Sequence, residues 1–97
     1  QVLICAVLFS FSDITSSNNI VVSGLPFTSS SATRFSNSIM GRYVNTGGDS
    51  ICAFIPENTT QVHFYTTNVG ADYARVQHTH LNNSSANFFL SISYRAA

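Results

Sequence analysis

The sequence contains no lysine and no tryptophan, and charged residues make up only 8% of its 97 positions. An ordinary soluble domain has about 25% charged residues. Four arginines balance four acidic side chains, so the formal net charge is zero. Such a chain lacks the electrostatic footprint that nucleic acid or an anionic membrane surface requires. The apolar run at 2–9 is also far shorter than the ~20 residues of a membrane span. We therefore expect neither nucleic acid as a partner nor membrane insertion.

Strong helix formers are scarce, since Glu57 is the single glutamate. Val, Ile, Thr, Phe and Tyr are abundant instead, and these side chains suit a pleated, half-buried surface. Serine, threonine and asparagine, with 15, 9 and 9 copies, form about a third of the chain. This composition predicts an all-β protein with a neutral, hydroxyl-rich surface. Because a protein of such low charge tends to self-associate, we expect an assembled protein outside the cytoplasm.

Cys5 and Cys52 are the two cysteines. They form no C-x-x-C motif, which argues against a zinc site and against thioredoxin-like chemistry. Two interpretations stay open: a pair of small buried apolar side chains, which we favour, and a disulfide.

Turn residues divide the chain into short apolar runs, which predict strands. The first run is apolar enough to predict a strand buried on both faces. In the last run Phe88, Leu90, Ile92 and Tyr94 share one face and are the predicted core. In the run at 61–67, Gln61, His63 and Tyr65 lie opposite the expected core face of Val62, Phe64 and Thr66. The predicted strands cover 1–12, 20–23, 35–45, 50–55, 61–67, 73–81 and 86–95, with an eighth strand if 35–45 splits, for example by a kink at Gly41. Seven or eight antiparallel strands predict a single jelly-roll sandwich over residues 1–97.

The segment Ile20–Phe27 reads IVVSGLPF. Val21, Leu25 and Phe27 are predicted to enter the core. Gly24 permits a bend or bulge, and Pro26 ends the strand or lies at an edge, because it cannot donate to a ladder.

The sequence resembles the trimeric head domains at the C-terminal ends of phage and virus tail fibres. The resemblance is carried by the segment IVVSGLPF, by the TSSSAT that follows it, by Gly41-Arg42-Tyr43-Val44 and by the terminal Ile92-Ser93-Tyr94-Arg95. The resemblance implies a compact jelly roll of the complement and tumour-necrosis-factor type, assembled as a homotrimer. It also implies an extracellular location at the fibre tip of a virion, and attachment to a host surface glycan or protein. Such domains usually have a further polar segment before the first apolar strand, so we expect the chain from Gln1 onward to be the C-terminal fragment of a longer fibre protein.

No constellation of residues predicts catalysis. The G-x-S-x-G elbow is absent, and the four acids, Asp13, Asp49, Glu57 and Asp72, lie near predicted turns or strand ends. Turn capping explains Asp49 and Asp72. We therefore expect no enzyme, no catalytic residue and no cofactor.

His78-Thr79-His80 is the sharpest local signal. On a strand both imidazoles would project to the same side, and three copies around an axis would offer six nitrogens to a transition metal. A solvated or hydrogen-bonded pair is the favoured alternative, and ligand contact is a third, so we assign no metal ligand. Tyr65 and His63 suit either a subunit interface, which we favour, or a sugar platform.

The leading hypothesis is a trimeric attachment head, with ligand contacts in loops or in grooves between protomers. The candidate loops are 28–33, 46–49 and 82–85, and no ligand-binding residue is assigned within them. The alternatives are a trimerisation and folding cap, or a particle decoration domain, without a ligand of its own. A secreted eukaryotic trimer of the complement type is less favoured.

Overall fold

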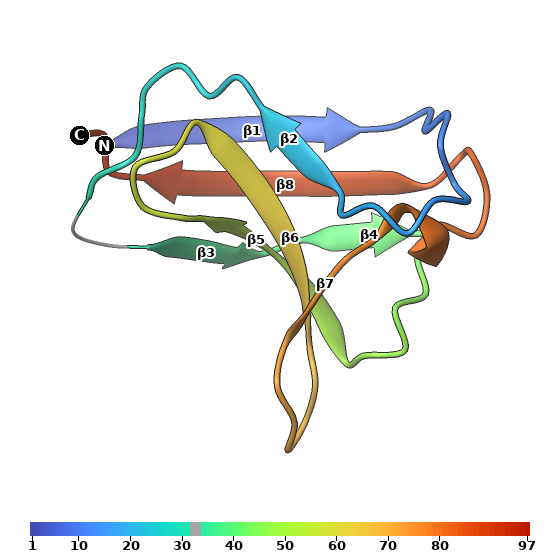
Figure 1. Ribbon diagram of the computed structural model, residues 1–97. Helices are drawn as coiled ribbons and strands as arrows, with labels where there is room; N and C mark the ends of the chain where they lie inside the picture. Colours follow the sequence, from blue (N-terminus) through green and yellow to red (C-terminus); the bar gives the residue numbers. More distant parts are fainter. Residues whose placement is uncertain (32–33) are drawn as a thin grey trace.

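The computed structural model describes residues 1–31 and 34–97, and in these residues the chain forms eight strands and one short 3-10 helix, with no α-helix (Figure 1). The elements are β1 (Val2–Leu8), β2 (Val21–Ser23), β3 (Phe35–Ser38), β4 (Met40–Arg42), β5 (Ser50–Ile55), β6 (Gln61–Thr67), β7 (Ala74–Arg75), η1 (His78–His80) and β8 (Asn87–Tyr94). The all-β prediction is confirmed. Within the same residues, no helix has the length and hydropathy that crossing a bilayer requires.

The strands form two antiparallel sheets. The smaller sheet has the order β1-β8-β4. The larger sheet has the order β2-β6-β5-β3, and β7 pairs with β6 as well. β2 pairs with the first residues of β6 and β7 with its last ones, so these two short strands lie along different parts of β6. In Figure 1 the hairpin of β6 and β7 extends away from β1 and β8.

The strand predicted over 35–45 divides at Ile39, and its two halves belong to different sheets. β3 pairs with β5, whereas β4 pairs with β8. The kink expected at Gly41 therefore lies two residues earlier. Gly41 has a packing role instead, because a Cβ atom at this position would lie 2.7 Å from Cδ1 of Ile51. The absent side chain lets β4 approach β5.

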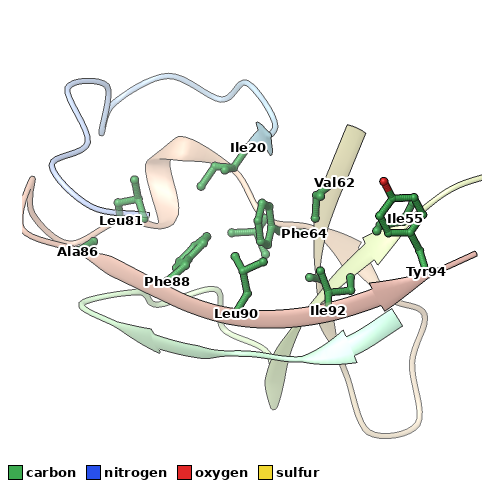
Figure 2. Packing of buried hydrophobic residues seen from close by; sticks show 12 residues of the cluster. Ile20, Ile55, Val62, Phe64, Leu81, Ala86, Phe88, Leu90, Ile92 and Tyr94 are labelled. Carbon is green, nitrogen blue, oxygen red and sulfur yellow. The ribbon is translucent and has the colours of Figure 1, made fainter. Parts of the chain in front are cut away.

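The core lies between the two sheets and consists of alternate residues of β5, β6 and β8, with Ile20, Val76, Leu81 and Ala86 from the connecting segments (Figure 2). Phe88, Leu90, Ile92 and Tyr94 are all buried, as predicted from their alternation. The ring of Phe64, on the opposite sheet, lies 5.2 Å from the ring of Phe88 between centroids. Burial of large aromatic and aliphatic side chains at such close packing supplies most of the favourable free energy of folding.

The segment 20–27 differs from its prediction. Ile20 is buried and Leu25 is half-buried, but Val21 and Phe27 are 40% and 59% exposed. Val21 pairs with His63 and shares its outward face. Phe27 is held by its backbone, because the buried Tyr94 hydroxyl donates to the Phe27 carbonyl oxygen at 2.8 Å and accepts from its N–H at 3.3 Å.

The first strand is also not buried on both faces. β1 alternates regularly, with Val2, Ile4, Ala6 and Leu8 half-buried against the core. Leu3 and Val7 point outward and are 67% and 48% exposed. The prediction is wrong because no described segment covers the outer face of the smaller sheet, so only the inner face of β1 is packed.

Candidate functional site

The outer face of the larger sheet carries a row of aromatic side chains where a solvated antiparallel sheet usually has small polar ones. β6 alternates so that His63 and Tyr65 point away from the core, as predicted. β5 adds Cys52 and Phe54 to the same face, because Cys52 pairs with Tyr65 and Phe54 with His63. Directly opposite residues of an antiparallel pair lie on one face and contact each other.

Cys52, Phe54 and Tyr65 line a groove of about 340 Å³. Phe54 and Tyr65 meet edge to face with their ring centroids 5.5 Å apart. Tyr73, just before β7, meets Tyr65 in the same way at 5.0 Å. The groove lining, hereafter the aromatic groove, consists of Arg34, Ser36, Cys52, Phe54, Tyr65, Thr67 and Tyr73. Three rings bordered by hydroxyl and guanidinium groups form an apolar surface with hydrogen-bonding partners at its rim.

Two arginines stand beside the aromatic groove in different states. Arg34 forms an exposed ion pair with Glu57, at 3.0 Å between Nη2 and Oε1. Arg75 pairs across the strands with Tyr65, and its guanidinium lies 5.3 Å from the centroid of the Tyr65 ring. The Nε of Arg75 is buried and finds no hydrogen-bond acceptor among residues 1–31 and 34–97.

The positive charge of Arg75 acts on its neighbour His63. Partial burial lowers the pKa of His63 below its usual value, and the Arg75 charge lowers it further. The ring stays next to Gln61, with 3.0 Å between Nε2 and the Gln61 Oε1. The imidazole is therefore neutral near pH 7, and Arg75 is the charged group at this part of the face.

The strand predicted over 73–81 is reduced to Ala74–Arg75, and the two histidines that were predicted to share one side of it, His78 and His80, lie in η1. A 3-10 helix has three residues per turn, so residues two apart do not project to one side. Nδ1 of His78 lies 2.9 Å from the Asp13 carbonyl oxygen, and the Gln77 N–H donates to Nδ1 of His80 at 2.9 Å. The same-side arrangement is wrong, and the hydrogen-bonded interpretation is confirmed. In the described part of the chain, no group of three or more His, Cys, Asp or Glu could hold a metal ion.

The acidic residues hold turns and loops, as expected for two of them. Asp49 accepts the N–H of Val69 at 2.6 Å and thereby joins the loops 46–49 and 68–70. Asp72 accepts the N–H of Tyr73 at 2.9 Å. Hydrogen bonds from the Ser16 side chain and backbone, with a further backbone bond from Thr15, lower the pKa of Asp13.

Of the candidate loops, 46–49 and 82–85 are built by their own side chains. The Asn83 side chain accepts the N–H of Ser85 at 2.8 Å, and the Thr46 hydroxyl oxygen accepts the N–H of Gly48 at 3.2 Å. Neither loop belongs to the aromatic groove. Residues 32 and 33 of the loop 28–33 lie outside the described residues.

Both cysteines are free thiols, so the disulfide alternative is wrong. The expectation of burial fails for Cys5, which is exposed on the outer face of β1. Cys52 is half-buried, and burial raises the pKa of its thiol.

A second surface lies on the outer face of the smaller sheet. Val7, Phe89 and Met40 are directly opposite one another on β1, β8 and β4. Their exposures are 48%, 37% and 65%, and Leu3 on the same face is 67% exposed. We name this set of four side chains the apolar row. Exposed side chains that gather in this way on one sheet face mark an interaction surface.

Fold and surfaces together define a small two-sheet antiparallel β-sandwich with an aromatic groove on one sheet and an apolar row on the other. Comparison of the chain with protein-family models, with curated proteins and with solved structures gives no match. Function must therefore be inferred from the two surfaces themselves.

Sequence reasoning found Tyr65 and His63 but missed Phe54, Tyr73 and Arg75. A signal for Phe54 was present, because Cys52 and Phe54 alternate with the buried residues Ala53 and Ile55. Tyr73 and Arg75 carried no such signal, since the strand predicted to contain them is seven residues longer than β7.

Proposed function

We propose that this chain is a non-catalytic binding domain, a trimeric jelly-roll attachment head that holds a host surface carbohydrate in its aromatic groove. The observation that carries the proposal is the edge-to-face set of Phe54, Tyr65 and Tyr73 on a solvent-facing sheet. Rings that are apolar in body and polar at the tip can stack on the C–H face of a sugar while hydroxyls nearby bind its oxygens. Location at the tip of a virion fibre is part of the proposal and follows from the resemblance of the sequence.

The apolar row supports assembly as a homotrimer. Three copies that turn this face toward a common axis would bury the exposed rings and methyl groups of Leu3, Val7, Met40 and Phe89 against one another. The groove, on the opposite sheet, would remain open in such an assembly.

The carbohydrate proposal is tested on a glycan array with the purified domain and two variants. Tyr73→Ala removes an exposed ring of the groove and leaves the core intact. Tyr43→Ala removes an exposed ring outside the groove and is the matched control. We expect binding that Tyr73→Ala abolishes and Tyr43→Ala preserves. Absence of binding by the wild-type domain refutes the proposal.

The trimer is tested by sedimentation equilibrium. Met40→Glu places a charge in the apolar row and is expected to yield folded monomers, because burying three unpaired carboxylates at one interface is costly. Val69→Glu, at the 88% exposed loop tip, is expected to stay trimeric. Cys5 lies on the same face as the row, so iodoacetamide is expected to label it faster in Met40→Glu than in wild type. A wild-type protein that sediments as a monomer contradicts the assembly.

A trimerisation cap or decoration domain without a ligand is the second candidate. The apolar row favours it, since that surface needs no ligand to explain it. A stable trimer that binds no glycan, while an upstream part of the same fibre does, would select this function.

A further inference from the structure

The charge of Arg75 has no counter-ion in the part of the chain that the structure describes. Its guanidinium rests on the Tyr65 ring at 5.3 Å, and no carboxylate of the described residues lies within 4.0 Å of it. A cation over an aromatic face is attracted by the ring, but this contact leaves the hydrogen-bonding directions in the guanidinium plane unused.

Every acidic side chain that could pair with Arg75 is engaged elsewhere. Glu57 binds Arg34, and Asp49 holds the N–H of Val69. Asp72 and Asp13 accept backbone N–H groups of their own loops. The described residues thus place no carboxylate at ion-pair distance from Arg75, and a carboxylate of another molecule would find its charge unpaired.

From this placement we propose that the aromatic groove selects a carboxylated sugar, a sialic or uronic acid residue, whose carboxylate binds Arg75 and whose ring packs on Tyr65 and Tyr73. The inference rests on the proposed function, because it names the class of glycan for the same groove. Guanidinium and carboxylate match in shape and charge and form two parallel hydrogen bonds. Tyr65 contacts both Arg75 and Tyr73, so the charged group and the stacking surface are adjacent.

Arg75 differs in this respect from the other arginines. Arg34 already has Glu57 as its partner, and Arg42 stacks on Tyr43 at 4.9 Å outside the groove. Arg95 lies near Gln1 and Phe35, away from the aromatic groove. Arg95→Gln therefore removes the same charge from the chain without touching the groove, and it is the matched control for Arg75→Gln.

The experiment is an NMR titration of the ¹⁵N-labelled assembled domain with four probes: 3′-sialyllactose, its methyl ester, lactose, and a glucuronate-containing hyaluronan tetrasaccharide. Wild type, Arg75→Gln and Arg95→Gln are compared after circular dichroism has shown that each is folded. We expect an acidic probe to shift the amides of Tyr65 and Tyr73, and we expect esterification to weaken its binding at least about tenfold. Arg75→Gln should lose binding to the same extent, and Arg95→Gln should retain it. The acidic probe that binds identifies the sugar as a sialic or a uronic acid.

The outcomes separate this inference from the proposed function. If lactose or the methyl ester binds as tightly as the acid, the groove is a neutral-glycan site and the inference is wrong while the proposed function stands. An equal loss in Arg95→Gln shows dependence on overall charge and also overturns the role of Arg75. If no probe shifts the groove amides, the inference is wrong, and the glycan array decides the proposed function separately. Comparison of acid and ester on wild type decides the matter even if Arg75→Gln does not fold.

Discussion

The hydroxyl of Tyr94 offers a direct test of how the segment 24–28 is fixed to the core. Tyr94 is 1% exposed, and its oxygen forms two hydrogen bonds with the backbone of Phe27, at 2.8 and 3.3 Å. Tyr94→Phe keeps the buried ring and removes only these bonds. A net hydrogen bond contributes about 0.5–1.5 kcal/mol. The bond at 3.3 Å is long and therefore weak, so we expect a loss of about 1–2 kcal/mol in the free energy of unfolding.

In a domain of this size such a loss lowers the melting temperature by about 5–10 °C. The assay is urea unfolding at a fixed protomer concentration, because the stability of an oligomer depends on concentration. Tyrosine fluorescence serves as the probe, since the chain has no tryptophan and four tyrosines.

Tyr43→Phe is the matched control. It also removes one phenolic hydroxyl, but Tyr43 is 47% exposed. The free energy of unfolding of the Tyr43→Phe variant should differ from that of the wild type by no more than about 0.5 kcal/mol, which is the usual effect of a surface substitution. If the two variants agree within about 0.3 kcal/mol, the anchoring role of the Tyr94 hydroxyl is refuted.

Three further predictions concern backbone space and titration. Gly48→Ala should destabilise the fold by about 1–3 kcal/mol in urea unfolding, because its Cβ would collide with the hydroxyl of the buried threonine in β6. Gly41→Ala should cost less, since the one atom within 3.0 Å of its Cβ is the end of the flexible Ile51 side chain. The pKa of His63 is lower in the folded protein than in the unfolded chain, so the unfolded chain binds the proton more readily. The free energy of unfolding should therefore fall as the pH drops from the unfolded pKa of about 6.5 toward the folded pKa. His63→Gln should reduce this pH dependence. Ser16→Ala should raise the pKa of Asp13, measured by NMR titration of the carboxyl, because it removes the largest cause of the lowering; an unchanged pKa would contradict that assignment.

Strands with strict alternation were predictable because local pattern and tertiary burial agree in them. β5 and β6 match their predicted bounds, and the core face of β8 is correct. In β6 and β8 every second residue is buried against the opposite sheet, so the period of two carries the information. The bounds of β5 followed instead from an apolar run that Pro56 closes. The position of the division at Ile39 was not predictable, because it depends on tertiary pairing. The residues before Ile39, in β3, pair with β5, and the residues after it, in β4, pair with β8.

The histidine segment failed for a different reason. Val76 is buried and continues the strand pattern, but the N–H groups of His78 and Thr79 bond to the carbonyl oxygens of Asn18 and Ser16. These hydrogen-bond partners lie some sixty residues earlier in the chain, and no local sequence pattern predicts them. Tertiary hydrogen bonds thus replaced a ladder that the sequence favoured.

The candidate site was predictable in kind but not in composition. Tyr65 was recognised as a side chain suited to a sugar or an interface, because it lies opposite the core face of β6. The cluster around it depends on the register of β5 and β7 against β6, and that register is set by the fold.

The bend at Ile39 has a mechanical consequence. A single continuous stretch of backbone passes from the larger sheet to the smaller one with one residue between them, so the two sheets are joined covalently along this margin. The two sheets cannot slide past each other there without breaking strand pairing in both sheets. We expect any opening of the molecule to start at the opposite margin, where β1 and β2 are the end strands of the two sheets and the twelve residues 9–20, not one, connect them. Amides of β1 should therefore exchange with solvent deuterium before those of β3 and β4.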